Sequence, residues 1–275
     1  MSPCIPIAEA GGFTPASSGG FGADGNPPRM KSYNGVMASW IVHLRVAENL
    51  LREFPALDES QFAVGNIAPD SGIPDEKWEN FSPPSAVSHF QDSTDVHRSC
   101  RDLDLYRKYL QPLGPASNVN EISFLWGYFF HLLTDNLWSI QIGRPTHERH
   151  AAQFNADKNF IWEVKKDWYG LDFVYLREHP DNLFSRVFLH ADYEGPDHEF
   201  MPAEAIRQRV AYIKQYYQRA DDQIQEMCAR PFIYLSKNEM DCFVKETSER
   251  MSAIYRYLSN HGETRDYGTV LSIRV

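Results

Sequence analysis

The sequence has few cysteines, and they lack the spacings that cysteine chemistry usually needs. Four occur among 275 residues, and no two of them form a C-x-x-C pair. This scattering argues against a zinc ribbon and against a dense disulfide framework. We therefore interpret all four as free thiols in a reducing compartment: Cys4, Cys100, Cys228 and Cys242.

Positive charge and long apolar runs are also scarce. The formal net charge is −10, so no general basic surface is expected for a stable nucleic-acid partner. Residues 1–10 lack the continuous apolar segment of a secretory signal. The longest apolar stretch, residues 122–140, contains His131 and Asp135 and is too polar for a transmembrane segment. We expect a soluble, cytoplasmic protein.

Three regions differ in composition. Residues 1–36 are rich in Gly, Pro and Ser, which predicts a disordered N-terminal extension because such a segment buries too little apolar surface to offset its ordering entropy. Residues 37–260 carry most of the apolar side chains and are expected to form one multi-helix domain. Residues 261–275 are expected to be a frayed C-terminal tail.

Apolar residues recur at helical spacing through residues 37–260, and strand signals are few. The fold class predicted is therefore all-α. Residues 71–84, rich in Gly, Pro, Asp and Ser, are expected to form a long loop. The segments expected to be helical are 38–54, 102–110, 122–140, 157–168, 172–176, 202–227 and 238–258.

One of these helices carries an unusual polar pair. His131 and Asp135 stand four residues apart in an otherwise apolar segment, so they share one buried helix face. An ionised carboxylate needs a partner there, because its unpaired burial costs several kcal/mol. A metal ion suits imidazole and carboxylate together. A hydrogen-bonded His–Asp core pair is an equal alternative from this segment alone.

Other segments add residues of the same kinds. His43 lies within an apolar helical stretch, Asp70 follows Pro69 where an apolar segment turns, and His89 follows the long loop. Each alone has an ordinary structural explanation, as a core histidine or a turn residue. Together with His131 and Asp135 they supply three imidazoles and two carboxylates, a plausible buried ligand set.

The order of these motifs resembles the zinc-dependent phospholipase C family, closest to its intracellular bacterial branch of hydrolases. The resemblance spans residues 38–258. The wider superfamily includes secreted phosphatidylcholine-cleaving enzymes and fungal single-strand nucleases. The motifs that carry it are Ala38-Ser-Trp-Ile-Val-His43, Gly65-Asn-Ile-Ala-Pro-Asp70, Ser88-His-Phe90 and Gly127-Tyr-Phe-Phe-His-Leu-Leu-Thr-Asp135-Asn136.

The resemblance implies a helical domain around a zinc cluster of one to three ions, with other divalent metals possible. By motif, the ligands of the central ion are Asp70, His89, His131 and Asp135. Asp135 would bridge to a second ion, which His43 binds. Asp70 would also be the general base of the reaction.

Two positions depart from the family pattern. Secreted members bind the second ion through the amino terminus of a Trp, whereas Trp40 is internal here. They place a further histidine where this chain has Gln141, a poor zinc ligand. The candidates for a substitute ligand are Asp167, beside two lysines and two aromatic residues, and the less favoured loop residues His147, Glu148 and His150.

These observations predict a metal-dependent hydrolase of phosphoric esters, acting on a small-molecule or lipid substrate through a metal-activated water. The departures at Trp40 and Gln141 favour an alternative, a metal-binding helical protein without turnover. A second alternative is a core without metal, in which His131 and Asp135 pair only with each other. Metal content and activity distinguish the three.

Overall fold

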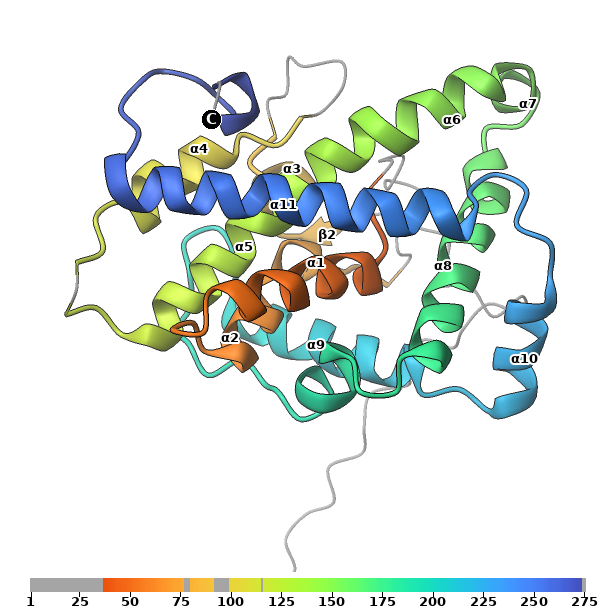
Figure 1. Ribbon diagram of the computed structural model, residues 1–275, viewed down its shortest axis with the longest axis horizontal. Coiled ribbons are helices and arrows are strands. Elements are labelled where there is room, and N and C mark those ends of the chain that lie inside the picture. Colours follow the sequence, from red (N-terminus) through yellow and green to blue (C-terminus); the bar gives the residue numbers. More distant parts are fainter. Residues whose placement is uncertain (1–36, 77–79, 92–98, 115, 274–275) are drawn as a thin grey trace, which may run out of the picture.

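The computed structural model describes residues 37–76, 80–91, 99–114 and 116–273. The expected disordered extension, residues 1–36, lies outside these ranges. Among the described residues the regular secondary structure is helical except for one small two-stranded ribbon, which confirms the all-α prediction (Figure 1). None of the described helices combines the length and apolar character needed to cross a membrane.

The first half of the chain supplies the helices nearest the predicted ligands. A two-stranded antiparallel ribbon, in which Ile73 pairs with Ser82, lies within the segment expected to be only a loop. The elements are α1 (Trp40–Glu53), α2 (Glu59–Gly65), the 3-10 turn η1 (Ala68–Asp70), β1 (Ile73–Pro74), β2 (Phe81–Ser82), α3 (Ser85–Ser88), α4 (Asp102–Leu105), the π-helical turn η2 (Tyr106–Leu110) and α5 (Val119–Trp138).

The second half surrounds α5 and α1. Helix α11 runs over both of them across the molecule, and α8 stands at one end (Figure 1). The elements are the π-helical turn η3 (Ser139–Gly143), α6 (Arg144–Arg149), α7 (Ala151–Ala156), α8 (Phe160–Glu178), the π-helical turn η4 (Phe184–Phe188), α9 (Ala203–Tyr217), α10 (Asp221–Ala229), α11 (Lys237–His261) and the 3-10 turn η5 (Val270–Ser272).

Two of the expected helix boundaries were wrong. Gly170 was expected to separate two helices, but α8 continues through it; a Cβ there would lie 2.7 Å from a ring atom of Phe232, so this glycine allows close packing. The single helix expected over 202–227 is divided at Gln218, whose ψ of 64° is not helical. This break lets α10 pack against α8.

The described part of the C-terminal tail packs against the domain. Val270 is fully buried, and its N–H donates to Asp102 Oδ1 over 2.9 Å. The expectation of a frayed tail therefore does not hold for residues up to Ile273, which is also buried.

Helices α2 and α5 make the closest contact in the fold. A Cβ on Gly65 would lie 2.1 Å from the carbonyl oxygen of Phe124, and one on Gly127 would lie 2.3 Å from that of Phe62. Two facing glycines thus let the backbones meet, as small residues do wherever helices approach closely. This contact fixes the segment after α2, including Asn66 and Asp70, against the middle of α5.

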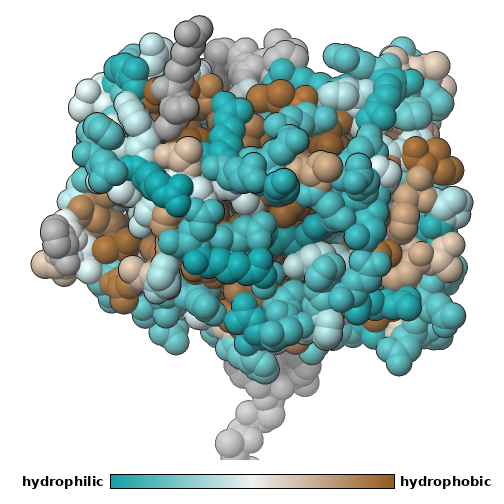
Figure 2. Space-filling model, in the orientation of Figure 1, coloured by the Kyte–Doolittle hydropathy of each residue, from teal (hydrophilic) through white to brown (hydrophobic). Residues whose placement is uncertain are grey.

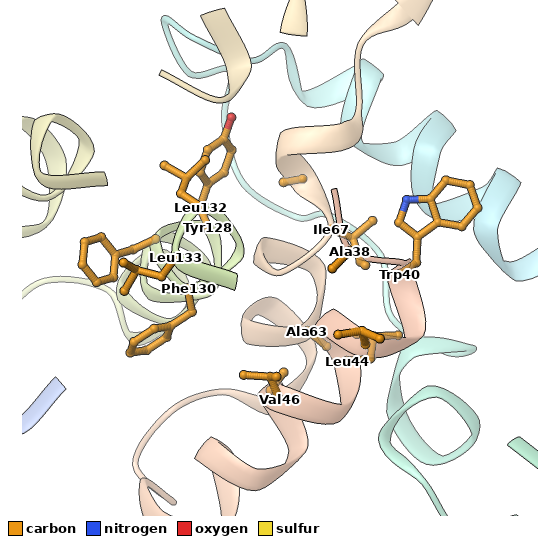
Figure 3. Close-up of a cluster of buried hydrophobic side chains, with 14 of the residues drawn as sticks. Ala38, Trp40, Leu44, Val46, Ala63, Ile67, Tyr128, Phe130, Leu132 and Leu133 are labelled. Atoms are coloured by element: carbon orange, nitrogen blue, oxygen red, sulfur yellow. The ribbon is translucent and has the colours of Figure 1, made fainter. Parts of the chain in front are cut away.

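One hydrophobic core joins α1, α2 and α5. Figure 3 shows side chains from all three, with Leu44 and Val46 from α1, Ala63 from α2, and Phe130 and Leu133 from α5. Hydrophilic residues cover most of the face seen in Figure 2, and the large exposed apolar side chains are far apart in the sequence. The ligand candidates therefore lie inside a well-packed helical core.

Candidate metal centre

Helix α5 carries the centre of the site. It begins at its N-cap residue Asn118, whose side chain accepts a hydrogen bond from the Asn120 N–H, and then runs through an unbroken series of buried residues. His131 and Asp135 lie one turn apart on it, both buried. The distance from His131 Nε2 to Asp135 Oδ2 is 3.1 Å.

Three other elements bring the remaining residues to this pair. Helix α1 supplies His43, the 3-10 turn η1 supplies Asp70, and the residue that ends α3 is His89. His43 Nε2 lies 3.4 Å from Asp135 Oδ1, and His89 Nε2 lies 3.6 Å from Asp135 Oδ2. Asp70 Oδ1 lies 3.4 Å from His89 Nε2. The five residues expected as ligands therefore meet.

These residues form two overlapping groups able to hold a metal ion. One comprises His43, His131 and Asp135, the other Asp70, His89 and His131, and within each group the potential ligand atoms lie within 4.8 Å of one another. His131 belongs to both groups.

The spacing within the groups suits a tetrahedral metal. Zinc–ligand bonds of about 2.0–2.1 Å in a tetrahedral arrangement place the ligand atoms about 3.3 Å apart. The contacts among the five residues range from 3.1 Å, between His131 and Asp135, to 4.0 Å, between His131 Nε2 and Asp70 Oδ1. Small side-chain movements would bring them to ligand distance.

Several ligand atoms are buried without a hydrogen bond. Although His131 Nε2 and Asp135 Oδ2 lie close together, neither has a hydrogen-bond partner, and the same is true of His43 Nε2, which faces Asp135. Leaving one buried polar atom unsatisfied costs about 1–3 kcal/mol. Three such atoms around one point favour a bound cation over a hydrogen-bonded core pair.

The far sides of two imidazoles are held by backbone carbonyls. His131 Nδ1 lies 2.7 Å from the Asn66 oxygen, and His89 Nδ1 lies 3.1 Å from the Ser85 oxygen. A carbonyl only accepts hydrogen bonds, so each Nδ1 carries the proton. Each Nε2 then presents a lone pair to the cluster, as outer partners of metal-binding histidines generally ensure.

Both carboxylates are also held by donors. The Ala38 N–H donates to Asp135 Oδ1 over 3.1 Å, and the Trp40 indole N–H donates to Asp70 Oδ2 over 2.9 Å. The residues just before and within the first turn of α1 thus orient both acidic ligands. Trp40 is held in turn by edge-to-face contacts with three tyrosines of α9: Tyr212, Tyr216 and Tyr217.

The pKa shifts of His43 and Asp135 favour metal binding, whereas the carboxylates of Asp135 and Asp70 raise the pKa of His131 against the effect of its burial. Burial lowers the pKa of His43, and the neighbouring His131 lowers it further. Burial opposes ionisation of Asp135, but the neighbouring imidazoles of His131 and His43 outweigh it and lower the pKa of this carboxyl. A neutral imidazole and an ionised carboxylate are the forms that bind a metal ion.

The site reaches the surface at Asp70. Its side chain is 11 % exposed, whereas those of the four other candidate ligands are at most 3 % exposed. Asp70 lines a small pocket with Gly72 and the ribbon residues Phe81 and Pro83. This is the side from which a water or a small molecule has access.

A buried lysine lies near the two carboxylates. Burial lowers the pKa of Lys165 to about 8, against the charges of Asp70 and Asp135, which raise it. In the sequence it is one of the two lysines that precede Asp167. The structure gives it a distinct position, because Lys166 instead pairs with Glu163 at 2.6 Å.

Asp167 belongs to neither group. Its Oδ2 accepts hydrogen bonds of 2.6 Å from the backbone N–H groups of Ile233 and Tyr234, and its Oδ1 lies 3.2 Å from Arg230. This carboxylate ties the segment after α10 to α8. The sequence motif of adjacent lysines and aromatic residues did not indicate this role.

Gln141 and the other residues considered as substitute ligands also lie outside both groups. Gln141 is exposed in the π-helical turn η3, and His147 and Glu148 are exposed in α6. His147 stacks on Phe154, and His150 packs edge-on against Tyr234. Among the described residues, no third group of potential ligands appears.

The groups that orient the ligands could not be identified from sequence patterns. The Ala38 N–H and the carbonyls of Asn66 and Ser85 belong to the backbone, which every residue shares. The indole of Trp40 was part of a recognised motif, but its contact with Asp70 joins residues 30 positions apart. Only the fold reveals these contacts.

Comparison of the chain with family models, with curated proteins and with solved structures finds no match in any of the three. The metal centre therefore rests on the residues themselves: buried His and Asp side chains that can hold a metal ion.

Proposed function

We propose that this protein is a metal-dependent hydrolase of phosphoric esters, related to the zinc-dependent phospholipase C family. The observation that carries the proposal is the cluster of unsatisfied imidazole nitrogens around Asp135, beside an accessible Asp70. The order of the sequence motifs, which resembles that of the phospholipase C family, indicates the class of reaction. Zinc fits the ligand set best, because imidazole and carboxylate in a site of this spacing are its usual partners.

His43, Asp70, His89, His131 and Asp135 would hold a divalent ion, which when bound would lower the pKa of a coordinated water from about 15.7 towards about 7 and would neutralise charge on the phosphoryl oxygens. Asp70 is the general base by position, since it alone among the five residues reaches solvent. It takes the proton of the attacking water and returns it to the departing alkoxide as the ester P–O bond breaks. The Trp40 indole keeps its carboxylate oriented.

The decisive experiment measures metal content together with hydrolysis of a panel of phosphomonoesters and phosphodiesters. Wild-type protein, purified without an affinity tag, should contain stoichiometric metal and hydrolyse part of the panel. Asp135→Ala should lose both. Asp172→Asn, which alters a buried carboxylate outside both metal groups, should keep its metal. Wild-type protein without stoichiometric metal would refute the proposal.

A metal-binding protein without turnover is the second candidate. The exposed position of Gln141 favours it, because the family's further histidine has no counterpart there or among the other described residues. Metal-loaded protein that is inert on the whole panel would establish this alternative. A metal-free, fully folded protein would instead indicate a core His–Asp cluster.

A further inference from the structure

Two buried cations approach the candidate metal centre from outside the ligand set. Lys165 on α8 is 5 % exposed and Arg209 on α9 is 6 % exposed. Burying a charge costs several kcal/mol unless other charges or hydrogen bonds compensate it. Neither residue is a candidate metal ligand. Metal binding therefore does not explain why these two cations are buried.

Lys165 lies on the face of α8 that is turned towards the start of α1. Tyr169 and Asp172 follow it by four and seven residues and therefore share its face. Asp172 accepts a 2.6 Å hydrogen bond from Ser39, directly before α1. The Lys165 ammonium lies 5.2 Å from the ring centroid of Trp162, and its charge interacts with those of Asp70 and Asp135.

Arg209 lies beside the residues that flank Asp70. Its guanidinium lies 5.9 Å from the ring of Trp40, the residue whose indole donates to Asp70. Its Nη2 donates to the carbonyl of Gly72 over 3.4 Å, and Gly72 and Asp70 line the same pocket. Within the described ranges, no carboxylate oxygen lies within 4.0 Å of this guanidinium, so an anion could still pair with it.

We propose that Lys165 and Arg209 bind the terminal oxygens of a phosphate group, and that the substrate is a phosphomonoester. This rests on the proposed hydrolase function and deepens it. A monoester has three terminal oxygens and carries up to two negative charges, whereas a diester has two such oxygens and one charge. Two cations beside the metal groups match the greater charge, and Arg is suited to bind two phosphate oxygens at once.

The experiment is calorimetric titration of the zinc-loaded protein with inorganic phosphate, methyl phosphate and dimethyl phosphate. Lys165→Met keeps the apolar stem against Trp162, and Arg209→Met removes only the guanidinium. The matched controls are Lys166→Met on α8 and Arg207→Met on α9. Both alter cations that are more exposed than Lys165 and Arg209. Lys166 pairs with Glu163, and Arg207 pairs with Glu204. Zinc content is measured in every variant.

Each of the two test variants should bind inorganic phosphate about tenfold more weakly, a change of about 1.4 kcal/mol, with unchanged zinc content. The controls should stay within about twofold of wild type. Wild-type protein should bind methyl phosphate at least about tenfold more tightly than dimethyl phosphate, and Lys165→Met should narrow that difference. Should Arg209→Met fail to fold, Arg209→Lys retains the charge and should keep most of the affinity.

Two results would overturn the inference. Phosphate affinity within about twofold of wild type in both test variants, with zinc retained, would show that the cations only balance the charges of Asp70 and Asp135. Equal affinity for methyl and dimethyl phosphate would reject the monoester. If wild-type protein holds no zinc, the proposed hydrolase fails, but the same titrations without metal still test whether Lys165 and Arg209 bind phosphate.

Discussion

The imidazole rings of His43 and His131 are stacked, with centroids 3.9 Å apart and planes within 3° of parallel, although one comes from α1 and the other from α5. Two protonated imidazoles so close would repel each other, and His131 indeed contributes to lowering the pKa of His43. Asp135 contacts both rings through different oxygens. The stack thus presents two nitrogens to one carboxylate, and these three residues form one of the two groups.

His131 is common to both groups, whereas His43 belongs to one. His131→Gln should therefore abolish metal binding. The loss of metal affinity should exceed the loss of about 10–100-fold that follows removal of a hydrogen-bond partner of a ligand. His43→Gln should lower the number of ions bound but keep those held by Asp70, His89 and His131. Elemental analysis with chelator competition measures both quantities. Equal metal loss in the two variants would contradict two overlapping groups.

The indole of Trp40 should tune the affinity of the Asp70 group. Trp40→Phe removes the donor to Asp70 Oδ2 but retains an aromatic ring against the α9 tyrosines. We expect zinc affinity to fall about 10-fold, the lower part of the range for outer-shell partners, with little change in unfolding temperature. Competition with a zinc chelator tests this. Trp126→Phe, on the face of α5 towards Tyr106 and Tyr255, is the control and should leave the zinc affinity unchanged.

The close crossing of α2 and α5 should not tolerate a methyl group. Gly127→Ala would place its Cβ 2.3 Å from the Phe62 carbonyl oxygen, which is backbone and cannot rotate away. We expect the free energy of unfolding to fall by about 3 kcal/mol, the upper part of the usual cost of overpacking. Urea denaturation measures it. Gly114→Ala, where a Cβ would have no neighbour within 4 Å, should be nearly neutral, and similar losses in both variants would refute the steric account.

Asp172 should make stability depend on pH. Burial raises its pKa to about 7 from an ordinary value of 3.8, against the hydrogen bonds from Ser39 and Tyr217, which lower it. The folded protein therefore holds this proton where the unfolded chain has lost it. The resulting stability is complete at low pH and is lost as the pH rises from about 4 to about 7, by an amount on the order of 4 kcal/mol.

Asp172→Asn removes this titration, and its amide can still bind both hydroxyl groups. The unfolding temperature of wild-type protein should fall relative to the variant between about pH 4 and about pH 7. Measurements in the presence of a chelator exclude metal binding as the cause. A constant difference between the two proteins over this range would show that Asp172 does not titrate as its burial implies.

The sequence alone predicted the helical class and the identities of the five residues that meet. Helical periodicity is a local property, and the four-residue spacing of His131 and Asp135 places them on one face whatever the rest of the chain does. The apolar surroundings of that pair already required a partner for the carboxylate. Asp167 had chemically suitable neighbours in the sequence, yet it is bound to the backbone of Ile233 and Tyr234.

Only the tertiary structure decided which residues face Asp135. His43, Asp70 and His89 reach it through contacts across many residues, made possible by the backbone approach at Gly65 and Gly127. The same packing buries Lys165 and Arg209 near Asp70, although both resemble ordinary surface cations in the sequence. Burial and distance arise from the meeting of distant segments, and local sequence patterns do not determine them.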